Sequence, residues 1–174
     1  NSPTVINSIF YFRNFWDGRA NNMFNGRNPF GPRDPSAGID PANSVLVPMG
    51  NGELKPYPVM ISDASLASQA VGPPGSDLEM SCKGRLFEEI AVKLLPLKPL
   101  ASGQVVAYTD SLLGSLAARP YGLNTTYAAL VQKAFQSKFW SSRKLSVDGY
   151  TQMQKNFSLF FGLAVMLYES TLVS

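Results

Sequence analysis

Apolar residues recur at helical spacing along much of the chain, and this pattern predicts most of its structure. Pro96 and Pro120 come directly after two of these stretches and are expected to end them. Asn124 is a candidate N-cap for one helix, and Ser146 or Asp148 for the last and clearest one. The predicted helices are, in chain order, 85–95, 104–118, 125–137 and 148–172, preceded by a short buried helix or turn at 5–16 and one or two helical turns at 64–71.

A segment of different composition interrupts this pattern. Residues 21–62 are rich in proline, glycine and asparagine, which is typical of a long ordered loop or insertion. Within it, the apolar runs 45–47 and 54–61 flank a Gly-Asn-Gly sequence at 50–52, which predicts a small β-hairpin. Two prolines in the second run confine that strand to a sheet edge. The expected fold class is therefore mainly α, with one irregular insertion that contains a small hairpin.

Charge is sparse. Charged residues make up 16% of the chain, against roughly 25% in typical soluble domains, whereas apolar residues make up 45%. This balance indicates a real core and a surface partly covered by another domain, a partner chain or a large apolar cofactor. The net charge is +3 and the basic residues do not cluster, which argues against nucleic-acid binding. The longest apolar run, 157–168, is too short to span a bilayer.

The residue types limit the chemistry. The chain has no histidine, a single cysteine at Cys82 and no CxxCH motif, so it cannot attach a c-type haem by itself. Histidine-based metal sites and Ser/His or Cys/His nucleophilic systems are excluded as well. Acid–base chemistry would have to come from carboxylates, tyrosine, lysine or Cys82, and a lone cysteine is expected to be an inert buried thiol.

Three sequence blocks carry a family resemblance. The first is NSPTVIN at 1–7 with FWDGRA at 15–20, the second is QAVGP at 69–73 with LEM at 78–80, and the third is YESTLV at 168–173. Together, and in this order, they resemble the bacterial di-haem cytochrome c peroxidases and their MauG-type relatives. The resemblance brackets nearly the whole chain, and the long segment 21–62 is where the chain departs from compact family members.

That resemblance implies a setting for the chain. In the family, two cytochrome c-like domains each hold haem c through CxxCH. Hydrogen peroxide is reduced at the first haem, with electrons relayed through the second from a small electron-donor protein. Residues 1–174 would then be part of the N-terminal peroxidatic domain, a fragment or processed product without the haem-attachment segment. The haem-bearing remainder would be its partner, and the periplasm its expected location.

The resemblance also implies roles for individual residues. Glu79 and Gln69 match the family's distal catalytic pair, and Trp16 matches the tryptophan between the two haems. Glu79 would take a proton from peroxide and return it to the departing oxygen, while Gln69 would orient peroxide. The remaining matches are Arg19, Pro73 and Met80 at the cofactor, and Asn1 at a calcium ion.

Each assignment has a structural alternative. Glu79 could instead be a carboxylate at the N-terminus of a helix from about Lys83, and Trp16 could be a core aromatic. Arg19 could bind a haem propionate or pair with Asp17 or a backbone carbonyl. Phe160 and Phe161 are candidates for contact with a second domain. The alternative function is a non-peroxidatic electron-transfer or structural module of a multihaem assembly.

Overall fold

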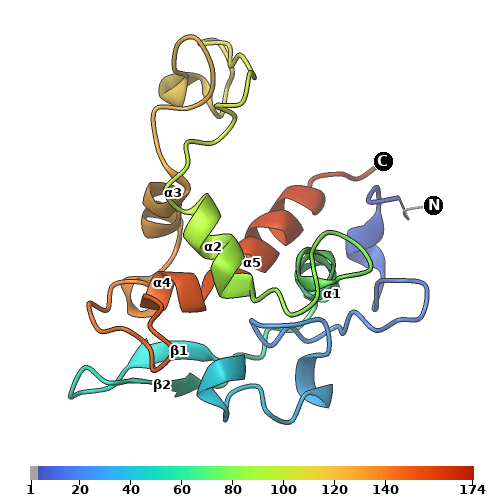
Figure 1. The fold of residues 1–174 in the computed structure, drawn as a ribbon. Helices are drawn as coiled ribbons and strands as arrows, with labels where there is room; N and C mark the ends of the chain where they lie inside the picture. The colour runs from blue at the N-terminus through green and yellow to red at the C-terminus, as the bar shows by residue number, and fades with distance from the viewer. Residues whose placement is uncertain (1–3) are drawn as a thin grey trace.

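A computed structural model describes residues 4–174 as helices joined by long irregular segments, with one small sheet (Figure 1). The expected mainly α class is correct in part, because the described residues form a mixed architecture of five α-helices and a two-stranded antiparallel sheet. The elements are α1 (Ser65–Ala70), α2 (Phe87–Leu94), α3 (Tyr127–Ala134), α4 (Gln152–Lys155), α5 (Phe157–Glu169), β1 (Val45–Pro48) and β2 (Leu54–Tyr57).

The core forms where α1 crosses α5. Gly162 makes this close approach possible, since a Cβ at that position would lie 2.8 Å from Cζ of Phe24 and 3.0 Å from the carbonyl oxygen of Ala67. Phe24 and Phe160 are both fully buried at this crossing or beside it. The expectation that Phe160 contacts a second domain is therefore wrong: its ring packs against Phe135 inside the core, with the centroids 4.7 Å apart.

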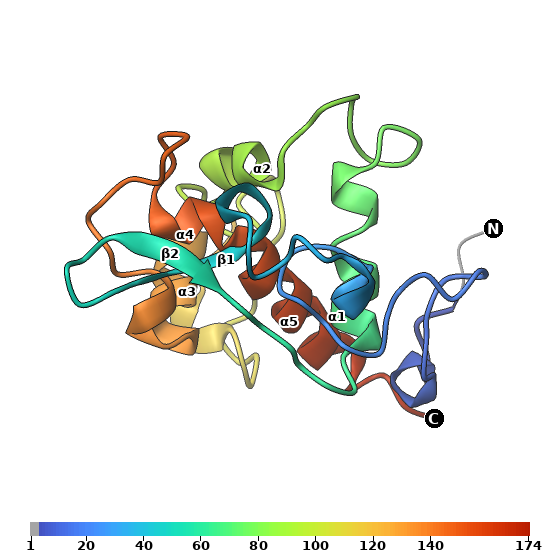
Figure 2. The same ribbon diagram turned by 90° about the horizontal axis from the view of Figure 1, so that it is seen from below.

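The segment 21–62 is part of the core rather than an appendage. Phe24, Val45 and Leu46 are buried, and Phe24 pairs with Ile61 through two backbone hydrogen bonds of 2.8 and 3.0 Å. The predicted hairpin is confirmed, with β1 and β2 in antiparallel register from Val45 opposite Tyr57. The hairpin lies beneath α4 in Figure 1, and the view from below in Figure 2 shows it and α1 toward opposite sides of the molecule.

The predicted helix 148–172 is two helices, α4 and α5, which break at the fully buried Asn156. Its side chain accepts a hydrogen bond from the Leu46 amide at 2.8 Å and donates to the Leu46 carbonyl at 2.8 Å and the Phe139 carbonyl at 2.7 Å. The N-cap is Thr151, whose hydroxyl accepts from the Gln154 amide, rather than Ser146 or Asp148. The hydrogen bonds between the Asn156 side chain and the Leu46 backbone thus accompany a break in the helix, so that two helices form in place of one long helix.

The helix predicted at 104–118 is wrong. Residues 104–118 form turns and the 3-10 helix Gly114–Leu116, in a lobe between α2 and α3 that projects from the body (Figure 1). Asp110 accepts hydrogen bonds from the backbone amides of Leu112 and Leu113, a local turn that competes with helix formation. Residues 5–16, predicted as a short buried helix or turn, form turns and the 3-10 helix Ser8–Phe10, but the predicted burial is wrong, because most of their aromatic side chains are exposed.

The predicted helices at 85–95 and 125–137 are confirmed as α2 and α3. Thr126 caps α3 by accepting from the Ala129 amide, in the place expected for Asn124. In the described part of the chain, no helix combines the length and apolar character needed to cross a membrane.

A buried charge cluster joins the segment 21–62 to α2 and α4. Glu88 accepts from Arg27 at 2.8 Å and from Lys155 at 2.9 Å, and Lys155 also donates to Asp148 at 2.8 Å. The Glu88 and Lys155 side chains are each only 2% exposed. Burial works to raise the pKa of Glu88, but Arg27 and Lys155 outweigh it and hold that pKa below its ordinary value.

Candidate functional site

The structure brings the first and second resemblance blocks together at Arg19 and Glu79. Nη2 of Arg19 lies 3.9 Å from Oε1 of Glu79, although the two residues are far apart in the sequence. Both side chains are partly exposed, at 33% and 40%. A carboxylate and a guanidinium thus share one accessible surface.

The Phe15 ring packs against the Arg19 side chain of this pair. The guanidinium carbon of Arg19 lies 3.9 Å from the centroid of the Phe15 ring, within cation–π range. A Cβ added at Gly72 would lie 3.2 Å from Cζ of Phe15, so the glycine of the QAVGP block leaves room for the ring. Phe15 itself has φ +63°, a left-handed conformation that is costly for a bulky residue and often marks functional sites.

Asp17 holds the other edge of the guanidinium. Nη1 of Arg19 donates to the two Asp17 carboxylate oxygens at 3.2 and 3.3 Å, and the Arg19 amide donates to Oδ1 at 3.1 Å. Desolvation works to raise the pKa of Asp17, but these hydrogen bonds outweigh it and hold that pKa below its ordinary value. Asp17 and Glu79 therefore face the same guanidinium from different edges.

Glu79 lies in a series of turns that follows α1 in the sequence. The 3-10 helix Pro73–Gly75 follows α1, and the Ser76 carbonyl then accepts the amides of Glu79 at 3.3 Å and Ser81 at 2.9 Å. Helix α2 begins only at Phe87, and its first turn has its own acidic residues, Glu88 and Glu89. The alternative reading of Glu79 as a helix N-terminal carboxylate is therefore wrong.

Gln69 lies in the last turn of α1 and is half-buried. Its carbonyl accepts the Gly72 amide at 3.1 Å, which places it one turn before the glycine that contacts Phe15. The described residues show no hydrogen bond between the Gln69 and Glu79 side chains. The two larger cavities, of about 490 and 460 Å³, are lined by other residues, so Glu79 opens to the surface rather than into either of them.

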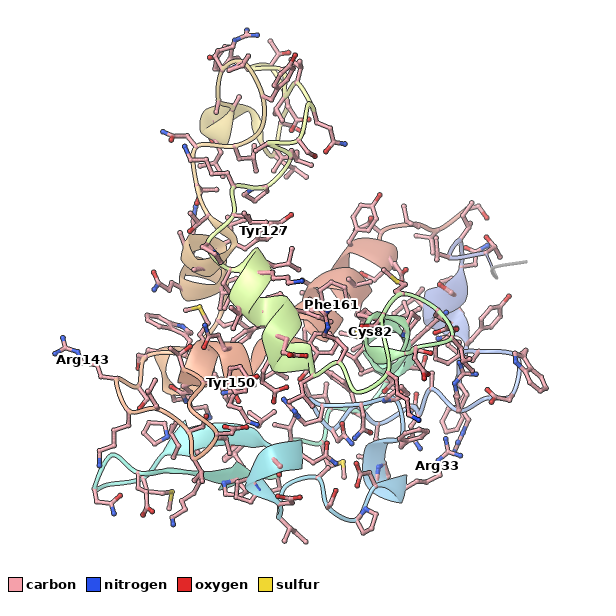
Figure 3. All side chains as sticks on the ribbon, viewed as in Figure 1. Arg33, Cys82, Tyr127, Arg143, Tyr150 and Phe161 are labelled. Carbon is pink, nitrogen blue, oxygen red and sulfur yellow. The ribbon has the colours of Figure 1, made fainter. Side chains whose placement is uncertain are left out.

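Large apolar side chains stand exposed beside the pair. Trp16 is 95% exposed, so its reading as a core aromatic is wrong. Leu78 is 92% exposed, and Met80 on the other side of Glu79 is exposed too. Cys82, expected to be buried, is an exposed free thiol in the loop between α1 and α2 (Figure 3). Exposed large apolar residues thus lie close in the sequence to both Arg19 and Glu79.

The third resemblance block lies against the first. The Asn7 amide donates to the Leu172 carbonyl at 2.9 Å, and the Asn7 side chain exchanges hydrogen bonds of 2.9 and 3.0 Å with Ser174. Phe161, expected to face a second domain, is partly buried and packs edge-on against Phe87. The described residues of the three blocks therefore lie on one side of the molecule, around α1 and the C-terminal end of α5 (Figure 1).

The chain offers exposed apolar side chains, Trp16, Leu78 and Met80, of the kind that could contact the apolar plane of a haem, but no group that could attach one. The Arg19 guanidinium is already engaged by Asp17, Glu79 and the Phe15 ring. Attachment and histidine ligation would come from outside, because the chain has no histidine and a single cysteine. Within 4–174, no three His, Cys, Asp or Glu side chains gather as a metal site, and Asn1 lies outside the described residues.

Phe15 and the Glu88 cluster were not identified from the sequence. Glu88 is spaced three and seven residues before Ala91 and Leu95, both buried, so the helical period already placed it on the apolar face of α2. A charged residue there implies a buried partner. No comparable signal existed for Phe15, since its position depends on Gly72 from a distant segment.

Comparison with protein-family models, curated proteins and solved structures returned no match, so the candidate site is defined by the chain's own residues.

Proposed function

We propose that this chain forms one wall of the peroxide-reducing site of a di-haem cytochrome c peroxidase. The haem would be held by the remainder of that protein. The observation that supports this most is the meeting of Arg19 and Glu79, two positions in separate resemblance blocks, on a surface with exposed Trp16 and Leu78. If the two short motifs resembled the family only by chance, there would be no reason for them to lie next to each other in the folded chain.

The residues of this chain would handle protons and position the substrate. Reduction of hydrogen peroxide to two waters consumes two electrons and two protons, and a bound haem supplies the electron chemistry. Glu79 takes a proton from one peroxide oxygen and delivers it to the departing one, a contribution of about 10²–10⁴-fold. Gln69 orients peroxide through its amide, while Pro73 limits movement of the connecting turn.

The wider setting belongs to the same proposal. Trp16 passes electrons between the haems, a small donor protein supplies them, and Asn1 contributes to a calcium site at the domain boundary. The protein acts in the periplasm, because c-type haems are attached outside the cytoplasmic membrane.

A second candidate is electron transfer without peroxide turnover. The near-complete exposure of Trp16 favours it, because an aromatic side chain at the surface can contact a redox partner directly. The two candidates separate on peroxide dependence: the peroxidase oxidises a reduced donor only when hydrogen peroxide is present, whereas an electron-transfer module does so with any suitable acceptor.

The location of the haem can be tested through Cys82. A nitroxide attached to this exposed thiol in the haem-bearing full-length protein should show strong relaxation enhancement by the oxidised iron. The matched control is the same label at R143C in a C82S background, because Arg143 is exposed at the opposite edge of the molecule (Figure 3). Equal, weak enhancement at both positions would contradict a haem on the Glu79 side.

A further inference from the structure

We propose that Arg19 is a positioning residue for Glu79, restraining the turn that carries this carboxylate from a platform made by Phe15 and Asp17. Only the effect of this restraint on catalysis rests on the proposed function. The restraint itself is a property of this chain and can be measured without any cofactor.

The guanidinium of Arg19 is fixed on three sides. Its face lies on the Phe15 ring, its Nη1 edge is occupied by Asp17, and its Nη2 is the group nearest Glu79. The backbone is fixed as well, because the Arg19 amide donates to Asp17 and its carbonyl accepts from Arg33 Nη2 at 2.7 Å. A planar, preorganised fork of this kind loses little further rotamer freedom when it meets a second carboxylate.

The platform is maintained at an energetic cost. A left-handed backbone is costly for a bulky non-glycine residue, and Phe15 adopts it at φ +63°. The packing of the Phe15 ring between Gly72 and Arg19 offsets this cost. Strained residues that persist because their surroundings require one conformation concentrate at functional sites. The Phe15 conformation therefore fixes the position of the Arg19 side chain.

Glu79 needs such a restraint because its own segment provides little. Its turn is closed by two backbone hydrogen bonds to the Ser76 carbonyl and one of 3.3 Å from the Leu78 amide to the Ser76 hydroxyl, and the flanking Leu78 and Met80 side chains are exposed. The other charged residues of this segment, Asp77 and Lys83, are exposed as well. Arg19 is thus the one described ion-pair partner that connects the Glu79 side chain to the body of the molecule.

Amide hydrogen exchange of Glu79 and Ser81 measures the restraint, because both amides donate to the Ser76 carbonyl. A partly exposed pair contributes about 0.2–1 kcal/mol, which corresponds to up to about fivefold in local opening. Arg19→Gln should therefore accelerate exchange at both amides about two- to fivefold, and Arg19→Lys, which keeps the charge but loses the planar fork, should restore only part of the protection. Arg13→Gln removes an exposed cation from the same segment with no described carboxylate partner and should leave both rates unchanged.

A double-mutant cycle separates positioning from general loosening. If the pair acts as one unit, R19Q combined with E79Q accelerates exchange no more than either single change. Additive effects, or no effect of R19Q, would overturn the inference even if Glu79 proves catalytic. Conversely, coupling in exchange together with unchanged peroxide turnover in E79Q would leave the restraint intact and reject the proposed function. In the haem-bearing protein, the inference expects R19Q to lower kcat about two- to fivefold with little change in KM.

Discussion

Asn156 and Leu46, on opposite sides of the hairpin–helix interface, exchange two hydrogen bonds of 2.8 Å in the core. The Leu46 amide donates to the Asn156 side-chain oxygen, and the Asn156 amide group donates back to the Leu46 carbonyl. Strand β1 is therefore hydrogen-bonded on one side to β2 and on the other to the break between α4 and α5. This contact makes the segment 21–62 a structural part of the domain.

Replacing Asn156 by alanine should destabilise the protein strongly. The change leaves the Leu46 amide and the Phe139 carbonyl without a side-chain partner, whereas the Leu46 carbonyl keeps its hydrogen bond from Gln152 at 2.9 Å. An unsatisfied buried group costs about 1–3 kcal/mol, so we expect a loss of at least about 2 kcal/mol in the free energy of unfolding by urea. Asn124→Ala, at an exposed position, is the control and should change it by less than about 0.5 kcal/mol. A small effect of N156A would show that the strand does not depend on this amide.

Glu88→Gln should be more damaging than loss of an exposed carboxylate. It leaves Arg27 and Lys155 buried beside a neutral group, and breaking a buried ion pair typically costs about 3–5 kcal/mol. Glu53→Gln breaks the exposed pair with Lys55 and should cost less than about 1 kcal/mol. Chemical denaturation of both variants beside the parent chain tests the difference. Similar losses in the two variants would contradict a central role for the buried cluster.

The same cluster predicts acid sensitivity. The pKa of Glu88 is lowered from 4.5 and that of Asp148 from 3.8, so ionised forms are favoured in the folded chain. Their stabilisation is fully present above the unfolded-state pKa values and is lost as pH falls through the lowered folded-state values. The free energy of unfolding should therefore decline below about pH 4.5, and less steeply in E88Q. Parallel slopes for the two proteins would assign the acid sensitivity to other groups.

Gly162→Ala should destabilise the α1–α5 crossing although alanine favours helices. Alanine gains about 1 kcal/mol in helix propensity over glycine. The added Cβ, however, would meet Cζ of Phe24 at 2.8 Å and the Ala67 carbonyl at 3.0 Å, and the backbone atom cannot move aside cheaply. Overpacking costs of about 1–3 kcal/mol then exceed the gain and lower the thermal midpoint. Gly50→Ala, with open space around it, is the control and should not lower the midpoint.

Local signals in the sequence predicted the elements that depend on local interactions. The Gly-Asn-Gly turn between two apolar runs identified the hairpin, and helical spacing identified α2 and α3. The break at Asn156 was not predictable in this way, because it is caused by a strand 110 positions earlier. Asp110 illustrates the opposite error, since its side chain forms a local turn where apolar spacing indicated a helix.

At the candidate site, too, local contacts were predictable from the sequence and long-range contacts were not. The pairing of Arg19 with Asp17 was among the alternatives drawn from the sequence, because the two are close neighbours in one turn. Its approach to Glu79 depends on how the turn at Gly72, which follows α1, packs against Phe15, and no local pattern encodes this contact. The exposure of Trp16 likewise could not be read from an aromatic-rich segment that resembles a buried helix.

Peroxide turnover by Glu79→Gln in the haem-bearing full-length protein is the most direct test of the proposed role of this chain. Steady-state oxidation of a reduced donor by hydrogen peroxide would be compared in the parent, E79Q and the surface control E53Q. Loss of the acid–base group should lower kcat/KM by about 10²–10⁴-fold in E79Q and leave E53Q close to the parent. Equal turnover in all three proteins would contradict the assignment of Glu79 as the proton-handling residue.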